Sequence, residues 1–352
     1  AVPAALALVA FALEEGQTVP VGWLANRSTL VATTFGCLAL AAYLRHRETP
    51  TLRSAWLATG LATLTVLSGE YALMILSYAV AFELAAAEGT WVARMRASWP
   101  ITLPALAYLG LRSLLGRDVH GSGYYISPFS VPLEFAQLTL TRVPVMLADL
   151  VFGLPSGHFQ GTGPLHDELL ARGLLSPEAF QALPDWQTVH VVLGYVAGAL
   201  LLGVFRYAAC CAPESSRATL KGLALGVVLS LLPAAGSLPS ERLLLAASLG
   251  YFALIASCLW HAWTHAREQP REGVRRRALH ALLMLTTLAL TGTSFVMAPM
   301  RSAASARGFA DQAGALRAWA LAAELPETKR AHTDVYVIAS ADFTTAANLP
   351  FV

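Results

Sequence analysis

Charged residues are scarce in this chain of 352 residues, at 13% of the sequence against about 25% in typical soluble domains. The 24 basic and 22 acidic residues nearly cancel, to a net charge of +2. A protein that binds nucleic acid concentrates basic residues on one face to neutralise phosphates, so this balance argues against nucleic acid as a partner. Hydrophobic residues reach 56% of the chain, which a soluble core does not explain.

Cysteine is also scarce, and its arrangement indicates neither redox nor metal chemistry. There is no C-x-x-C pair among the four cysteines, so we interpret them as structural thiols. The nine histidines form no H-E-x-x-H pattern. His261 and His265 are four residues apart at a helix end, but no carboxylate accompanies them, and interfacial anchoring is the preferred interpretation. The sequence therefore predicts no metal-ligating set.

Long apolar stretches separate the few charged residues along the sequence. A hydrocarbon core about 30 Å thick needs about 20 apolar residues in a helix, with a lower limit near 17. The clearest stretches cover 28–44, 99–115, 189–204, 222–235, 243–263 and 278–297. The sequence therefore predicts an all-α polytopic membrane protein.

Arginine and lysine gather in alternate connecting loops, and this pattern orients the helices. Short cytoplasmic loops retain Lys and Arg, whereas the loops on the other side carry few of them. The basic loops contain Arg45, Arg47, Arg53, Arg94, Arg96, Arg206, Arg217, Lys221, Arg267, Arg271, Arg275, Arg276 and Arg277. We therefore expect 14–27, 68–70, 116–188 and 237–242 to face outward, in a multi-pass protein of a cell inner membrane.

Two short apolar segments, 57–67 and 72–84, predict a helical hairpin that turns at Gly69-Glu70. The alternative is one long tilted helix with Glu70 buried in the membrane. That alternative would invert half of the arginine clusters, so we prefer the hairpin. The count is then about nine transmembrane helices, the first of them partial.

Two parts of the chain are expected outside the membrane. The long loop 116–188 contains a near-helical apolar repeat over 133–150, which predicts an interfacial helix. The tail 301–352 begins as an amphipathic helix and continues, after Leu325-Pro326, as a strand over 334–339. We therefore divide the chain into a transmembrane domain, 1–300, and the start of a small α/β extracytoplasmic domain. Because Ala1 lies inside an apolar run, we expect further sequence before it.

Three stretches, in one order, carry a resemblance to a known family. Residues 21–32 read VGWLANRSTLVA, 69–73 read GEYAL, and 239–250 read PSERLLLAASLG. They resemble the V-x-W-x-A-x-R-x-x-L-L-A, K-E-x-A-L and E-R-Y-L-Y-L-P-S-x-G strings of the GT-C membrane glycosyltransferases. The transmembrane and tetratricopeptide-repeat O-mannosyltransferases and their bacterial relatives are the most similar in pattern. The resemblance covers about residues 12 to 300, and the acidic pair of this family would lie upstream of Ala1.

The resemblance implies a polyprenyl-phosphate-sugar-dependent glycosyltransferase that acts at the outer membrane face. Such an enzyme holds the phosphate of a lipid-phosphate-linked sugar donor. It also activates an acceptor or the departing phosphate with a carboxylate, often through a divalent metal ion. Glu14 and Glu15, in the first outer loop, are the candidate catalytic residues. The alternative for both is a solvated helix end.

Two arginines at the expected outer face are candidate phosphate-binding residues. Arg27 begins one apolar helix and Arg242 begins another, where the distribution rule predicts few basic residues. A guanidinium binds phosphate bidentately, so both arginines could line one lipid-phosphate pocket. The alternatives are snorkelling to the interface and, for Arg242, pairing with Glu241.

Three further residues complete the candidate substrate-binding set. If Glu70 lay inside the hydrocarbon core, its charge would carry the largest desolvation cost of any in the chain. A carboxylate inside a membrane is usually functional. At the surface it would be only a turn residue. Tyr124 and Tyr125 follow glycines in the long outer loop, where they could cover a sugar or lipid site or form a plain interfacial belt.

A second hypothesis of a different class is a catalytically silent GT-C-like membrane scaffold that anchors the extracytoplasmic domain beginning near Asp334. The sequence before Ala1 separates the two hypotheses. An acidic pair after one apolar helix favours the enzyme, and its absence favours the scaffold.

Cysteine accessibility labelling tests the predicted topology. Single cysteines placed at Ser156 and at Glu272 should react with a membrane-impermeant reagent from opposite sides, because the arginine loop 267–277 is retained inside. Labelling of both positions from the same side would refute the topology.

Overall fold

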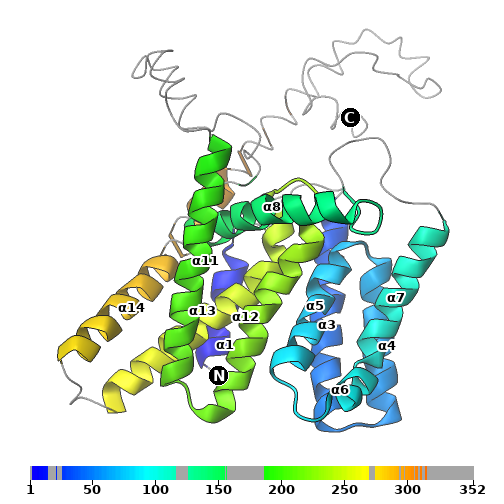
Figure 1. The fold of residues 1–352 in the computed structure, drawn as a ribbon, viewed down its shortest axis with the longest axis horizontal. Helices are drawn as coiled ribbons and strands as arrows, with labels where there is room; N and C mark the ends of the chain where they lie inside the picture. The colour runs from blue at the N-terminus through cyan, green and yellow to red at the C-terminus, as the bar shows by residue number, and fades with distance from the viewer. Residues whose placement is uncertain are drawn as a thin grey trace. The chain divides into compact units, whose positions relative to one another are not determined.

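The computed structural model of the chain (Figure 1) is all-helical wherever it is described, with twelve helical elements and no strand in those residues. The described residues are 2–14, 21, 26–115, 126–154, 156, 186–268, 274–292, 295–296, 298–304, 306–307, 310 and 314. The chain divides into two compact units, Ala1–Pro299 and Met300–Val352. The first is called the membrane unit below. The predicted strand over 334–339 lies outside the described residues.

The elements of the membrane unit follow one another along the chain with short connections inside the described ranges. They are α1 (Val2–Ala12), α3 (Arg27–Glu48), α4 (Leu52–Leu67), α5 (Tyr71–Ala85), α6 (Trp91–Ala97), α7 (Trp99–Leu114), α8 (Pro132–Phe152), α11 (Trp186–Cys211), α12 (Glu214–Ala234), η4 (Glu241–Leu244), α13 (Leu245–Glu268) and α14 (Val274–Gly292).

Five described helices are long and apolar enough to cross a membrane: α3, α8, α11, α12 and the helix formed by η4 with α13. Three shorter apolar helices, α1, α4 and α5, accompany them. The prediction of a multi-pass helical membrane protein is confirmed at this level. Two of the predicted stretches, 99–115 and 278–297, form α7, of 16 residues, and α14, which has three arginines in its first turn. Neither is among the five, so nine full spans are not shown.

The predicted break between two short apolar segments is confirmed. Helix α4 ends at Leu67 and α5 begins at Tyr71. Between them Gly69 adopts a φ of 136°, a backbone conformation that side-chain-bearing residues rarely take. The start of α4 is fixed by a capping box, in which Thr51 and Ser54 each satisfy a backbone N–H of the other. The alternative of one continuous helix through Glu70 is therefore wrong.

Helix α8 is the predicted helix over 133–150, and it crosses one end of the unit. Its carbonyl at Leu140 accepts a hydrogen bond of 2.7 Å from the Tyr195 hydroxyl, which lies nine residues into α11. Arg142 donates to the carbonyls of Ala235 and Ser237, directly after α12. Figure 1 shows α8 running across the end of α12 and past α11, whose first turns extend beyond it. Its length would also allow a span, so its place at the membrane interface stays a prediction.

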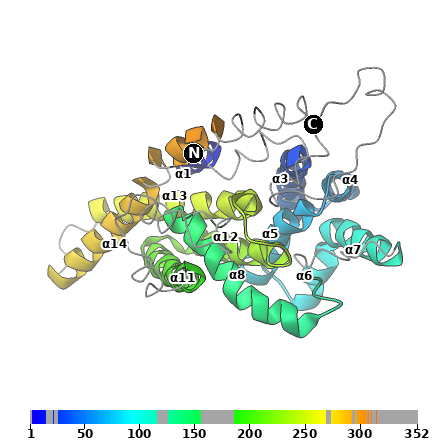
Figure 2. The same ribbon diagram turned by 90° about the horizontal axis from the view of Figure 1, so that it is seen from above.

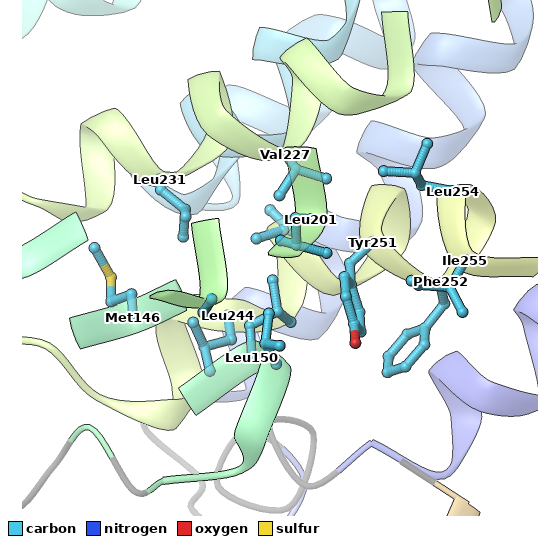
Figure 3. Close-up of a cluster of buried hydrophobic side chains, with 14 of the residues drawn as sticks. Met146, Leu150, Leu201, Val227, Leu231, Leu244, Tyr251, Phe252, Leu254 and Ile255 are labelled. Carbon is cyan, nitrogen blue, oxygen red and sulfur yellow. The ribbon is translucent and has the colours of Figure 1, made fainter. Parts of the chain in front are cut away.

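Two apolar clusters hold the helices together, and α5 contributes to both. The larger joins α8, α11, α12 and α13 through side chains such as Leu150, Leu201, Leu231 and Tyr251 (Figure 3). The smaller joins α3, α4, α5 and α7, largely through alanines, which let helix backbones approach closely. Figure 2 shows α5 beside α12.

Tyr78 fixes α5 against both α12 and α13. A Cβ at Gly226 or at Gly250 would overlap its ring, so both glycines are required for this contact. The Tyr78 hydroxyl donates to the Ala246 carbonyl at 3.0 Å and accepts from the Gly250 N–H at 3.1 Å. In a regular helix these two backbone groups bond to each other. The Tyr78 hydroxyl, which contacts both groups, therefore ties the first turns of α13 to α5.

The close crossing of α8 and α11 gives a stability prediction. A Cβ at Gly194 would overlap the backbone carbonyl of Pro144, whereas Gly203, on the same helix, has open space around its Cα. Gly194→Ala should therefore destabilise the protein by about 1–3 kcal/mol. Gly203→Ala should be neutral or stabilising, by up to about 1 kcal/mol. Thermal unfolding in detergent measures both, and equal melting temperatures for the two variants would contradict this packing.

Candidate functional site

Three segments far apart in the sequence come together at one end of the membrane unit. They are the end of α1, the residues before α3, and the connection from α12 into η4 and α13. The contact that joins two of them is a hydrogen bond of 3.3 Å from Arg242 Nη1 to Asn26 Oδ1, across 216 positions of the chain. Helix α1 packs along α13, which brings Glu14 to the same end. We call Glu14, Asn26, Arg242 and Tyr251 the junction cluster.

Local backbone geometry presents Arg242 to Asn26. Ser240 is extended, with φ −158° and ψ 154°, and the chain then tightens into the 3-10 turn of η4. Leu243 and Leu244 are 5% and 1% exposed, so the turn is fastened to the core on one side. Arg242 precedes them and its guanidinium extends toward the N-terminal end of α3.

Glu14 is a buried carboxylate, 7% exposed, and not a solvated helix end. It follows the last turn of α1, where its N–H bonds the Phe11 carbonyl. Its charge lies within electrostatic range of the Tyr251 hydroxyl, on α13. Tyr251 itself is 1% exposed. A carboxylate removed from water is costly unless it is paired or used, so its burial marks a position with a specific role.

Several buried polar atoms of this region have no hydrogen-bond partner among the described residues. They are Asn26 Nδ2, Thr29 Oγ1, Ser240 Oγ and Tyr251 Oη. A buried donor without a partner costs about 1–3 kcal/mol, and native structures keep few of them. These four atoms come from α3, the residue before it, α13 and the chain before η4, and they make this end of the unit suited to a polar ligand.

The other predicted site residues are distributed differently. Arg27 is the exposed first residue of α3, next to Asn26. Glu70 is 61% exposed at the α4–α5 turn, and its ion pair within the described residues is with Arg112 of α7. An exposed pair of this kind contributes about 0–1 kcal/mol. The structure thus places Arg27 beside the junction cluster and gives Glu70 the geometry of a turn residue.

Glu15, Tyr124 and Tyr125 lie outside the described residues. The residue directly after Tyr125 is described, and the Ile126 N–H donates to the Gly236 carbonyl at 2.7 Å. Gly236 belongs to the connection that leads to Arg242. The described end of the loop containing the two tyrosines therefore starts next to this connection.

The structure also reveals residues that sequence reasoning missed. Asn26 was part of the string at 21–32 but was assigned no role. Arg142 is 5% exposed and holds the carbonyls of Ala235 and Ser237, so it stabilises the connection that carries Arg242. An arginine in the otherwise apolar middle of a helix was the available signal. Asp149 is 3% exposed and accepts the Ser156 N–H at 2.8 Å, and no pattern marked it.

Among the described residues, no three His, Cys, Asp or Glu side chains gather as a metal site. A divalent metal ion therefore stays a prediction without assigned ligands. No family model, curated protein or solved structure matches the chain.

Proposed function

We propose that the protein is a membrane glycosyltransferase that uses a polyprenyl-phosphate-linked sugar at the outer membrane face, as the GT-C enzymes that it resembles do. The observation that carries this proposal is the junction cluster. It brings a buried carboxylate, an amide and an arginine to one end of long apolar helices. These are the groups that phosphate binding and general base catalysis require.

The place of the cluster along the helices suits a lipid donor. Asn26 precedes α3, whose other end carries Arg45 and Arg47. Twenty residues of helix separate Arg27 from Arg47, which at 1.5 Å per residue is about 30 Å, the thickness of a hydrocarbon core. A polyprenyl chain lies in the hydrocarbon core, and its phosphate lies at the boundary between the core and the headgroups. In this proposal Asn26 and Arg242 meet at the level of that boundary.

Each residue then has a defined role. The Arg242 guanidinium binds the donor phosphate, and Asn26 Oδ1 holds that guanidinium in position. The acceptor hydroxyl attacks the anomeric carbon of the sugar, and the bond from that carbon to the phosphate oxygen breaks with its electron pair on the phosphate. Glu14 accepts the proton of the acceptor hydroxyl. Arg27, the exposed first residue of α3, borders the lipid or sugar in this proposal. Glu15, Tyr124 and Tyr125 lie outside the described residues, and they stay sequence-based candidates: Glu15 for a second carboxylate and the two tyrosines for sugar or lipid contact.

Replacement of the two glutamates tests the catalytic role. Glu14→Gln together with Glu15→Gln keeps shape and removes charge, so sugar transfer should fall by about 10²–10⁴-fold, the range for a lost general base. The measurement is transfer from a polyprenyl-phosphate-linked sugar by the full-length protein. Glu48→Gln, at the exposed far end of α3, is the control and should keep full activity.

The outcomes separate the hypotheses. Full activity in the double variant would refute the catalytic role of Glu14 and Glu15. Absence of transfer by the unaltered full-length protein with every polyprenyl-phosphate sugar tried would favour the catalytically silent scaffold.

Arg242 gives a separate prediction about binding. Arg242→Ala should weaken donor binding more than Arg242→Lys, because lysine keeps a positive charge near the phosphate and alanine removes both the charge and the hydrogen-bond donors. Charge-assisted hydrogen bonds contribute about 1.5–3 kcal/mol, so the alanine variant should bind about tenfold to a hundredfold more weakly. Donor affinity can be measured in nanodiscs by titration. Equal affinity of the unaltered protein and both variants would make Arg242 an interfacial anchor.

A further inference from the structure

We propose that a second anion site, for the phosphate of an anionic phospholipid, lies at the opposite end of α3, where Arg47 and Arg94 converge on Glu83. This site is independent of the proposed transfer reaction. It is formed by α3, α5 and α6, away from the junction cluster.

Glu83 organises the site from the last turn of α5. Its side chain is 1% exposed, although it carries a carboxylate. One carboxylate oxygen, Oε1, accepts the Tyr43 hydroxyl and lies 2.8 Å from Arg47 Nε. The other, Oε2, is buried without a hydrogen-bond partner among the described residues. A carboxylate so enclosed holds its partners rigidly, because every alternative position leaves a buried charge unpaired.

Arg94 reaches the same residue from α6. Its Nη1 donates to the main-chain carbonyl of Glu83, and its guanidinium carbon lies 5.6 Å from the centre of the Trp91 ring. Two guanidiniums therefore converge on one residue that supplies one negative charge. The cluster of Arg47, Arg94 and Glu83 has a net charge of +1, and Arg94 has no carboxylate partner in the described part of the chain.

The surroundings favour a lipid over a dissolved anion. Trp56 and Trp91 are 59% and 52% exposed, and Val92 and Met95 of α6 are exposed beside the arginines. Exposed tryptophans and apolar side chains next to arginine characterise the headgroup boundary of a membrane. A ligand with an anionic phosphate and acyl chains satisfies both features. Other exposed charges at this end are Arg45, Arg53 and Arg96, against Glu48 and Glu88, so the surface stays positive overall.

The test uses the complete protein in nanodiscs of phosphatidylcholine with a minor fraction of phosphatidylglycerol. Native mass spectrometry counts the phosphatidylglycerol molecules that stay bound when the protein is released from the nanodisc. Arg94→Gln is the informative variant, because it removes the uncompensated charge and keeps a donor for the Glu83 carbonyl. Arg96→Gln is the matched control: it lies on the same helix, has the same charge and is exposed. Dissolved glycerol phosphate is added as a competitor in a parallel arm.

We expect the unaltered protein and the Arg96→Gln variant to retain phosphatidylglycerol selectively. The Arg94→Gln variant should bind this lipid at least about tenfold more weakly, because it loses a charge-assisted hydrogen bond. Equal losses in both variants would show diffuse surface attraction and overturn the site. A lower melting temperature of Arg94→Gln in pure phosphatidylcholine, with unchanged lipid retention, would make the cluster a structural tie. Displacement of the lipid by millimolar glycerol phosphate would identify a soluble anion as the ligand.

Discussion

The need to satisfy every backbone hydrogen bond inside a bilayer governs this structure. Hydrocarbon offers no partners for N–H and C=O groups, so a spanning segment must bond internally, and the regular elements of the described residues are all helices. Where the chain departs from regular helix, side chains or water-exposed turns supply the hydrogen-bond partners that the helix would supply. Gly69 turns the chain between α4 and α5 with Glu70 exposed. Arg142 binds the carbonyls that follow α12, and the Tyr78 hydroxyl bonds the Ala246 carbonyl and the Gly250 N–H in the first turns of α13.

The same constraint explains where the charges lie. A charge is costly in hydrocarbon and inexpensive at its boundary, so arginines and carboxylates accumulate at the helix ends. Helix α3 shows this on one element, since it begins beside the junction cluster and ends at the cluster around Glu83. Each cluster pairs arginine with a buried polar partner from another helix. The two proposed phosphate sites thus occupy opposite ends of the same apolar framework.

Much of the helical framework could be predicted from apolar length alone. The turn at Gly69-Glu70 and the helices around 28–44, 222–235 and 243–263 follow from it directly. Helix ends were harder to predict, because α11 continues to Cys211 past the apolar stretch that ends near Val204. The count of nine spans combined long helices with short ones such as α7, whose 16 residues fall below the length that a full span needs.

The candidate site was only partly predictable. Glu14 and Arg242 could be selected from the sequence, because each is a charged residue at the end of an apolar stretch, a feature that needs no alignment to recognise. The bond between Arg242 and Asn26 spans 216 positions and depends on how α1, α3 and α13 pack, which no local pattern encodes. Glu70 illustrates the converse case: the sequence indicated a carboxylate between apolar segments, and the fold exposes it and pairs it with Arg112.

Mapping the donor-binding position tests the central claim most directly. A polyprenyl-phosphate sugar with a photoreactive group on the sugar can be crosslinked to the full-length protein, and the modified peptides identified by mass spectrometry. The account predicts modification at Glu14, within 26–30 and within 235–251, the described residues at and next to the junction cluster. Modification confined to 45–54 and 83–96, at the other end of α3, would contradict it.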